Sequence, residues 1–346
     1  MSIKQKLRMR WNTYRQVDYV NRICGNKKLT GYYEGEIIRN VHSIEKGLSL
    51  DKPRQFFGIP KIIEMLNLVA EYVGMGGYST DVVNMALDAV DAYKEYHRDV
   101  LNNSKLRNII NKHDELRGKY PKMPKAYAGT LKIERKEKQN QFDELSSLIN
   151  ERHSVRDFSK APVPMKLLRS ACELALHAPS ACNRQGTRIY ILSEQKKDLL
   201  DEWLSGVGGF AEEVDKYIII TAKVSVYRFE EACQFQYVVS PAILAGYLSL
   251  SLQSLGIGAC LIQRPLVRTG SWVNFSKKLG SPVMRQSFPA FRAAFSVALI
   301  PPFWRCRRSD RSPPLSAHRC NGGRAGFDLA RPVPQWLPAD FQAGGS

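Results

Sequence analysis

The chain has 346 residues, of which 44% are hydrophobic and 24% charged, and its formal net charge is +18. This composition suits one large globular domain or two ordinary ones. The chain has no run of 18 apolar residues, so we expect no membrane span. The seven cysteines are scattered singly. They predict reduced thiols in a cytoplasmic protein and argue against a disulfide framework or a metal site.

The positive charge is concentrated near the C-terminus. Residues 232–346 hold 13 Lys+Arg against 3 Asp+Glu, whereas residues 151–231 hold 12 of each. The basic residues lack interleaved aromatic residues on one element, which are typical of surfaces that bind single strands. We therefore expect neither a nucleic-acid nor a membrane partner. The basic start of the chain has no apolar core behind it and is not a secretory signal.

Residues 1–116 are predicted to form a helical region. Apolar residues recur at helical spacing over residues 62–73 and again over residues 82–93. Pro60 suits the first turn of the first helix, and residues 79–81 (STD) suit the start of the second. The following segment, 117–147, is charged and poor in apolar spacing, so we expect a surface linker there.

Beyond the linker, the pattern predicts helices and strands together. Pro164 opens an amphipathic helix, and residues 241–255 are apolar on nearly every face. Such a helix belongs in the protein interior or in an oligomer interface. Short runs rich in residues that favour β-strands lie between and after these helices. The runs predicted as strands are 188–192, 217–222 and 259–262.

Residues 276–346 differ in composition from the rest of the chain. No Lys, Glu or Tyr occurs after Lys278, and nine of the 18 prolines fall within residues 281–346. Two interpretations stay open. The segment is either a poorly ordered Arg/Pro-rich tail, or a stretch that a frameshift has placed out of frame with the ancestral gene.

Three motifs carry candidate chemistry. In residues 151–158, ERHSVRDF, two arginines and a serine suit a phosphate, although a solvated surface run is commoner. In residues 178–185, APSACNRQ, small and amide side chains suit a planar polar ring, although a plain helix-ending loop would look similar. In residues 255–263, LGIGACLIQ, two glycines permit close backbone approach, as they would in a simple turn.

Together, and with GVGGF at residues 206–210, these motifs resemble the nitroreductase family of FMN enzymes over about one third of the chain. The resemblance implies an α+β fold over residues 148–275, a mixed sheet flanked by helices, preceded here by the all-helical region. It also implies a homodimer whose two subunits build the flavin site. Neither a catalytic side chain nor a metal is expected, because flavin N5 carries the chemistry.

The resemblance assigns FMN contacts by position. The first motif would meet the phosphate and ribityl chain, with Arg156 as an alternative contact to the pyrimidine edge. The second would contact the ring, and the third would lie over its face near N5. The predicted cofactor-binding residues are Arg152, His153, Ser154, Arg156, Pro179, Ser180, Asn183, Gln185, Cys260, Leu261, Ile262 and Gln263.

Three departures from the family pattern matter. Gly186-Thr187 stands where the family often has Pro-Trp, nothing after about residue 275 resembles the family, and the helical region is an addition. Within that region, His42, Glu45 and Lys46 could form a site, but a solvated helix with an internal ion pair is the simpler interpretation.

The implied activity is that of an NAD(P)H-dependent flavoprotein oxidoreductase. Hydride would pass from NADH or NADPH through FMN to a small acceptor, a nitroaromatic or quinone, by a ping-pong mechanism. One alternative is an FMN protein with a diverted oxidation in a biosynthetic pathway. Another is an inactive protein whose altered C-terminus prevents flavin binding.

Overall fold

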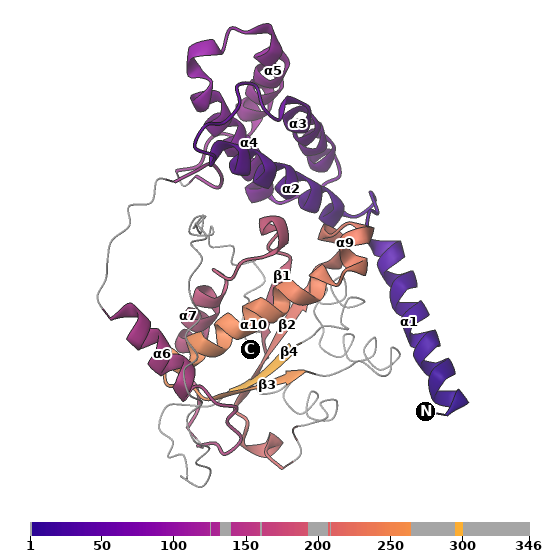
Figure 1. Cartoon of the computed structure of the whole chain (residues 1–346), viewed down its shortest axis with the longest axis vertical. Helices are drawn as coiled ribbons and strands as arrows, with labels where there is room; N and C mark the ends of the chain where they lie inside the picture. The colour runs from indigo at the N-terminus through magenta and orange to yellow at the C-terminus, as the bar shows by residue number, and fades with distance from the viewer. Residues whose placement is uncertain are drawn as a thin grey trace, which may run out of the picture.

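The structure, a computed structural model, describes residues 2–124, 126–131, 140–159, 161–192, 207, 209–263 and 295–299. Helices fill the first third of the chain, and a small sheet with further helices follows (Figure 1). The predicted α+β class is therefore confirmed. No helix in the described part of the chain is long and apolar enough to cross a membrane.

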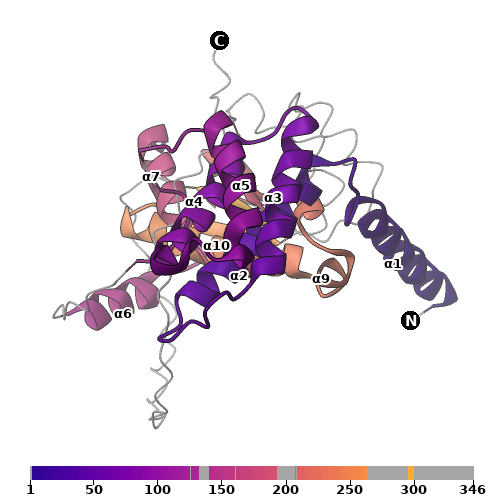
Figure 2. The same cartoon turned by 90° about the horizontal axis from the view of Figure 1, so that it is seen from above.

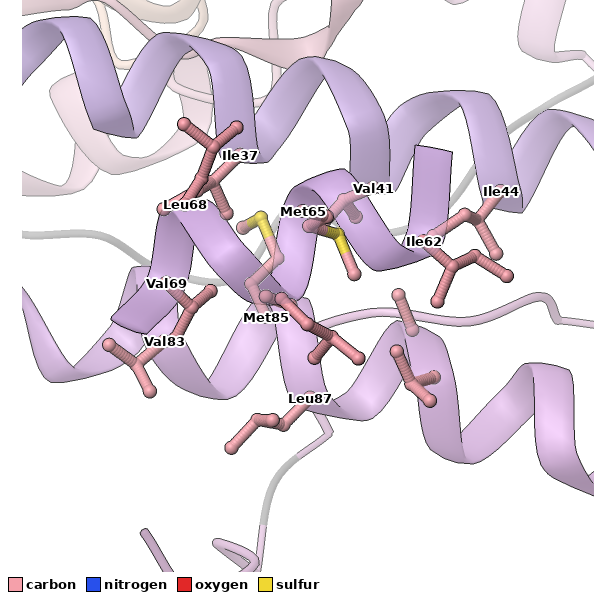
Figure 3. Close-up of a cluster of buried hydrophobic side chains, with 14 of the residues drawn as sticks. Ile37, Val41, Ile44, Ile62, Met65, Leu68, Val69, Val83, Met85 and Leu87 are labelled. Carbon is pink, nitrogen blue, oxygen red and sulfur yellow. The ribbon is translucent and has the colours of Figure 1, made fainter. Parts of the chain in front are cut away.

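The helical region confirms both predicted helices. Pro60 lies in the first turn of α3, and Ser79 is the N-cap residue of α4, although its side chain makes no capping hydrogen bond. Helices α2, α3 and α4 pack their apolar residues against one another in one buried core (Figure 3). The elements of this region are α1 (Ile3–Ile23), α2 (Thr30–Leu48), α3 (Ile59–Gly74), α4 (Thr80–Tyr96), η1 (Arg98–Val100) and α5 (Ser104–Lys119).

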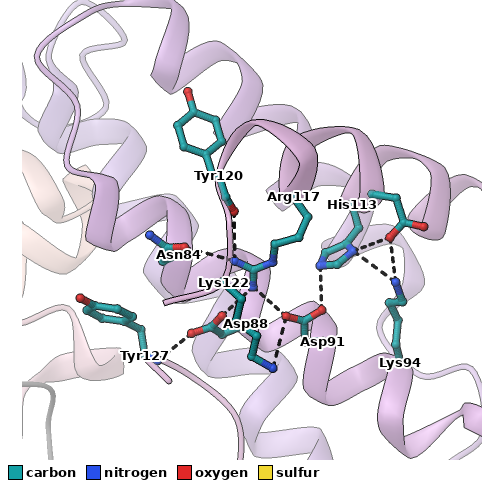
Figure 4. Close-up of polar contacts among 10 residues, drawn as sticks. Asn84, Asp88, Asp91, Lys94, His113, Arg117, Tyr120, Lys122 and Tyr127 are labelled. Carbon is teal, nitrogen blue, oxygen red and sulfur yellow. Dashed lines mark hydrogen bonds and ion pairs between the residues drawn. The ribbon is translucent and has the colours of Figure 1, made fainter. Parts of the chain in front are cut away.

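An ion network ties α5 to α4 (Figure 4). Arg117 Nη2 donates to Asp88 Oδ1 at 2.6 Å and to Asp91 Oδ2 at 2.7 Å. The buried His113 lies between Asp91, at 3.1 Å, and Asp114, at 2.9 Å. Burial acts to raise the pKa of Asp91, but His113 and Arg117 outweigh it and lower that pKa to about 2.

The second part of the chain confirms the three predicted strands within one residue at each end. The predicted apolar helix is α10, which begins five residues earlier than residue 241. The elements are α6 (Gln141–Glu151), α7 (Met165–Ala175), η2 (Ala181–Asn183), β1 (Thr187–Ile191), η4 (Ala211–Glu213), β2 (Lys216–Ala222), η5 (Val224–Val226), α9 (Phe229–Cys233), α10 (Gln236–Ser254), β3 (Ala259–Gln263) and β4 (Phe295–Leu299).

The four strands form one antiparallel sheet in the order β1-β2-β4-β3. Helices α7 and α10 pack on the sheet, and Leu168, Leu248 and Leu252 share a core with Ile218 and Ile220 of β2. Both faces of β2 are buried along its whole length. This explains its continuous apolar sequence, which is typical of a central strand.

Two predicted boundaries need correction. Strand β4 lies within residues 276–346, which we expected to be a poorly ordered tail, yet it occupies an inner position of the sheet. The apolar run FSVAL is a sufficient strand once it has a partner on each side, and its Arg/Pro-rich surroundings obscured it. Helix α6 likewise begins inside the expected linker, 117–147. The remainder of the expected tail lies outside the described residues.

The helical region joins the sheet domain through glycines of α2. A Cβ atom on Gly35 would lie 2.1 Å from the backbone oxygen of Val226, and one on Gly31 would lie 2.0 Å from Ser225 Oγ. Because neither position has room for a side chain, α2 approaches η5 at backbone distance. An ion pair also links the two regions, because Arg228 Nε donates to Glu36 Oε1 of α2 at 2.7 Å.

Candidate functional site

The first motif lies beside the edge strand of the sheet. Helix α6 ends at Glu151, and the chain then runs past β3, where Ser154 forms a parallel bridge with Ala259. The Val155 amide donates to the Ala259 carbonyl at 3.2 Å. The fold therefore brings the first and third predicted motifs together at one end of the sheet.

The cationic groups of this loop are free to meet an anion. Arg152 is half-buried, while His153, Ser154 and Arg156 are exposed. Arg156 Nη1 donates to the backbone oxygen of Ser154 at 3.4 Å, and neither arginine forms an ion pair with another described residue. A loop that offers two guanidinium groups and a hydroxyl without a carboxylate partner fits a phosphate.

Strand β3 supplies the third motif. Cys260 and Ile262 are buried, and Leu261 points to the exposed side of the strand. Gln263 ends the strand. Among the described strands, β3 pairs with β4 alone, and its other edge near Ala259 lies next to the Ser154 loop.

The second motif forms a strained turn between α7 and β1. Three of its residues have left-handed backbone although none is glycine, with φ of 51° at Cys182, 52° at Asn183 and 50° at Gln185. Each such residue costs on the order of 1 kcal/mol or more, and such strain gathers at ligand sites. The turn is held because Ser180 Oγ accepts from the Gln185 amide at 3.0 Å.

Other contacts fix this turn against its neighbours. Gln185 Nε2 donates to Asn183 Oδ1 at 3.1 Å, and the Ala181 amide donates to Ser240 Oγ of α10 at 3.4 Å. Pro179 is exposed, whereas Ser180, Asn183 and Gln185 are half-buried. The turn is thus rigid and still reachable from outside the chain.

Gly186 explains one departure from the family pattern. A Cβ atom at this position would lie 2.8 Å from Cγ2 of Val226. Val226 belongs to η5, the element against which Gly35 of α2 packs. The helical region and the altered residue after Gln185 are therefore parts of the same packing arrangement.

Arg184 is a cation that the sequence interpretation did not assign. Its side chain is fully buried, Nη2 donates to Glu231 Oε1 at 2.7 Å, and the guanidinium lies 5.4 Å from the ring centroid of Tyr227. Its Nε and Nη1 atoms are buried without a hydrogen-bond partner. The available signal was one charge within an otherwise uncharged turn, which sequence alone does not distinguish from a surface arginine.

We predicted that His42, Glu45 and Lys46 lie on a solvated helix. The helix that carries them, α2, is instead buried on one side along most of its length. Glu45 Oε1 accepts from the Gly129 amide at 3.1 Å. Burial, with the charges of Lys46 and Arg184, lowers the pKa of His42. This part of α2 therefore lies near the turn of the second motif.

The turn and the Ser154 loop lie at opposite ends of the sheet. Thr187, just after the turn, pairs with Ala222 at one end of β2, while Ala259 pairs with Leu299 and hence lies level with Lys216 at the other end. Seven residues of strand span roughly 20 Å. Within one chain, the second motif therefore does not converge with the first, whereas β3 runs from the level of Lys216 to that of Ile220, toward the turn.

Helix α10 leaves an apolar stripe uncovered between these two ends. Phe235, Val239, Ile243 and Tyr247 recur every four residues and are 37% to 54% exposed. The helix contains no charged residue. An exposed apolar stripe of this kind marks a protein interface.

Among the described residues, no group of three His, Cys, Asp or Glu side chains is placed to hold a metal ion. The five described cysteines are free thiols, and Cys24, Cys172 and Cys260 are buried. Burial raises the pKa of Cys172 to about 12, which keeps this thiol protonated and unreactive.

Comparison with known proteins places residues 149–284 in the nitroreductase family model, whereas no curated protein matches the chain. A nitroreductase family protein from Streptococcus pneumoniae is 20% identical, covering 49% of this chain and 96% of that one, with a TM-score of 0.37. An FMN-dependent nitroreductase from Clostridium difficile is 18% identical (47% and 90%, TM-score 0.37). A nitroreductase with bound FMN from Bacteroides fragilis is 16% identical (51% and 99%, TM-score 0.38). The family model alone identifies a nitroreductase domain at residues 149–284 of the chain.

Proposed function

We propose that the chain is an FMN-dependent oxidoreductase that passes hydride from NADH or NADPH to a small acceptor of the nitroaromatic or quinone type, in two half-reactions. The observation that carries this proposal is the family match over residues 149–284, which spans Arg152 and Arg156 in the loop beside β3, neither of them ion-paired with a described residue. FMN, when bound, supplies hydride transfer at N5.

Each motif has a binding role in this proposal. Arg152, His153, Ser154 and Arg156 hold the phosphate and ribityl chain through charge-assisted hydrogen bonds. Pro179, Ser180, Asn183 and Gln185 position the ring. The backbone of β3, from Cys260 through Leu261 and Ile262 to Gln263, lies against the ring face.

Two copies of the chain are needed to assemble this site. Because the turn and the Ser154 loop are separated by roughly 20 Å along the sheet, the loop of one copy meets the turn of another. The apolar stripe of α10 runs between the two ends of the sheet and supplies the interface of a homodimer.

Arg184 adds positive charge beneath the turn, whereas burial and the charges of Lys46 and Arg184 lower the pKa of His42 and favour its neutral form. Two buried nitrogen atoms of Arg184, Nε and Nη1, have no hydrogen-bond partner among the described residues. A cation near the pyrimidine edge stabilises the negative charge of a reduced flavin. We propose that Arg184 supplies this stabilisation from beneath the turn.

The purified full-length chain tests the activity directly. We expect a bound flavin spectrum that NADPH or NADH bleaches under anaerobic conditions and that a quinone or nitro compound restores. A yellow protein that is inert to both nicotinamides would favour a diverted oxidation in its place. That alternative draws support from Gly186, where the residue beside the ring turn differs from the family pattern. A colourless protein that takes up no added FMN would leave the inactive-protein alternative.

Complementation between two defective variants tests the shared site. Arg156→Glu damages the loop, and Pro179→Glu damages the turn, both at exposed positions. Each variant alone should lose FMN binding. A mixed dimer should regain one intact site out of two, since one intact loop then faces one intact turn. If the mixture binds no more FMN than either variant alone, each site lies within one chain and the proposed assembly is wrong.

A further inference from the structure

Helix α1 stands apart from the rest of the molecule. It projects away from the sheet domain in both views of the chain (Figures 1 and 2), and the contacts that the described residues make with it lie near its C-terminal end. There Val20 and Cys24 are buried against η5, and Cys24 Sγ donates to the Val224 carbonyl at 3.6 Å. Its 21 residues make a rod of roughly 30 Å.

The free part of α1 carries one continuous apolar stripe. Ile3, Leu7, Trp11, Tyr14 and Val17 recur every three or four residues and are 46% to 77% exposed. Trp11 stacks on Tyr14 with a centroid distance of 5.8 Å. Since each residue turns the helix by about 100°, these five share one side. Val20 and Ile23, which pack against the sheet domain, lie on another side of the helix, so the described part of the protein does not cover the stripe.

Basic residues flank this stripe. Residues 2–23 contain six Lys or Arg and one acidic residue, Asp18. At helical spacing, Lys4 and Arg8 border the stripe on one side and Lys6 borders it on the other, while Arg10 lies at the stripe's edge between Ile3 and Val17. Long basic side chains beside an exposed Trp and Leu face can extend their charges to the level of lipid phosphates while the apolar groups enter the bilayer.

We propose that α1 is a membrane-surface helix that docks the protein on an anionic lipid bilayer. The charge pattern selects this occupant, because the basic flanks match a negatively charged surface and the apolar face matches the acyl boundary. A bound helix lies in the plane of the interface and does not span it. The helix is prepared for this role by its own capping box, in which Ser2 and Gln5 satisfy each other's backbone amides at 2.7 Å and 3.2 Å.

Vesicle binding of the full-length chain tests the proposal. We expect the protein to sediment with vesicles that contain phosphatidylglycerol and not with vesicles of phosphatidylcholine alone, and salt should weaken the binding. Leu7→Gln with Trp11→Gln should weaken it at least tenfold, as should Lys6→Glu with Arg10→Glu. Matched controls at exposed sites on other helices, Phe142→Gln and Lys105→Glu with Arg107→Glu, should bind like the parent.

Three results would overturn the proposal. The first is equal binding to both kinds of vesicle, or binding to neither. The second is salt-sensitive binding of duplex DNA that persists when Leu7 and Trp11 are replaced, which would make α1 a nucleic-acid arm. The third is dissociation of an oligomer by the Leu7 and Trp11 replacements in light scattering, which would make a second copy of the chain the occupant of the stripe.

Discussion

The helical region from α2 to α5 and the sheet domain differ in how much of their apolar surface they bury. In the helical region, Ile37, Ile62 and Val83 face one another in a common core, and the charges of Asp88, Asp91 and Arg117 meet in pairs. In the sheet domain, α10 leaves four large apolar residues exposed, and the two halves of the proposed site face away from each other.

This difference is what we expect if, as proposed, a second copy of the chain completes the sheet domain while the helical region forms its core alone. The helical region also packs against the sheet domain. Helix α2 approaches η5 at backbone distance and brings His42 near the strained turn. We therefore expect substitutions in the two regions to fail in different ways, and the following predictions separate them.

The largest effect is expected at the exposed stripe of α10. Ile243→Asp places a charge where the proposed interface would exclude water, which should raise the dimer dissociation constant at least about 100-fold. Bound FMN should be lost with the dimer, while the circular dichroism of the chain stays unchanged. Light scattering and flavin absorbance measure both effects. Phe142→Asp on α6 is the control; dimerisation that survives Ile243→Asp would contradict the interface.

The junction between the regions should respond next. Gly35→Ala sets a methyl group 2.1 Å from a backbone oxygen, and we expect it to lower the free energy of unfolding by about 3 kcal/mol. The matched control is Gly118→Ala in α5, where a Cβ atom meets nothing within 4 Å. That control should be neutral or stabilising by up to about 1 kcal/mol. Urea titration measures both, and equal effects of the two variants would mean that the close approach does not matter.

A smaller effect, which depends on pH, is expected within the helical region. Asp91 has its pKa lowered from 3.8 to about 2, so the unfolded chain takes up its proton first as the pH falls. Its contribution of about 2 kcal/mol is therefore fully present above about pH 4 and is lost as the pH falls to about 2. Asp91→Asn should destabilise the chain at pH 6 and much less at pH 2. If the difference in unfolding free energy between Asp91→Asn and the parent chain is the same at pH 6 and pH 2, the contacts of Asp91 with His113 and Arg117 are not its cause.

The sequence predicted the elements whose signals are local. The repeats in α3 and α4 and the apolar runs of β1, β2 and β3 depend on residues close together in the chain, and each was found within a few residues of its place. The motifs on the Ser154 loop and on β3, which we predicted to contact one flavin, lie side by side in the structure. They meet because the loop pairs with the strand.

The features that were missed depend on distant partners. Left-handed backbone is usually predicted from a glycine. Cys182 and Asn183 adopt it without being glycine, so no local pattern in the sequence indicates it. Arg184 is buried only because Glu231 and Tyr227 come from a later part of the chain. The separation of the turn from the loop follows from the order of the strands, which composition and periodicity do not specify.

Strand β4 has a consequence for how the chain is made. Its five residues, Phe295–Leu299, lie between β2 and β3, both of which leave the ribosome earlier. Until the ribosome has passed residue 299, the facing edges of β2 and β3 remain unpaired, and an unpaired edge invites association with other chains. The helical region needs nothing beyond residue 131 for its core and can fold while translation continues. The sheet, and with it any flavin site, depends on residues 295–299, so a premature stop before residue 295 would prevent it.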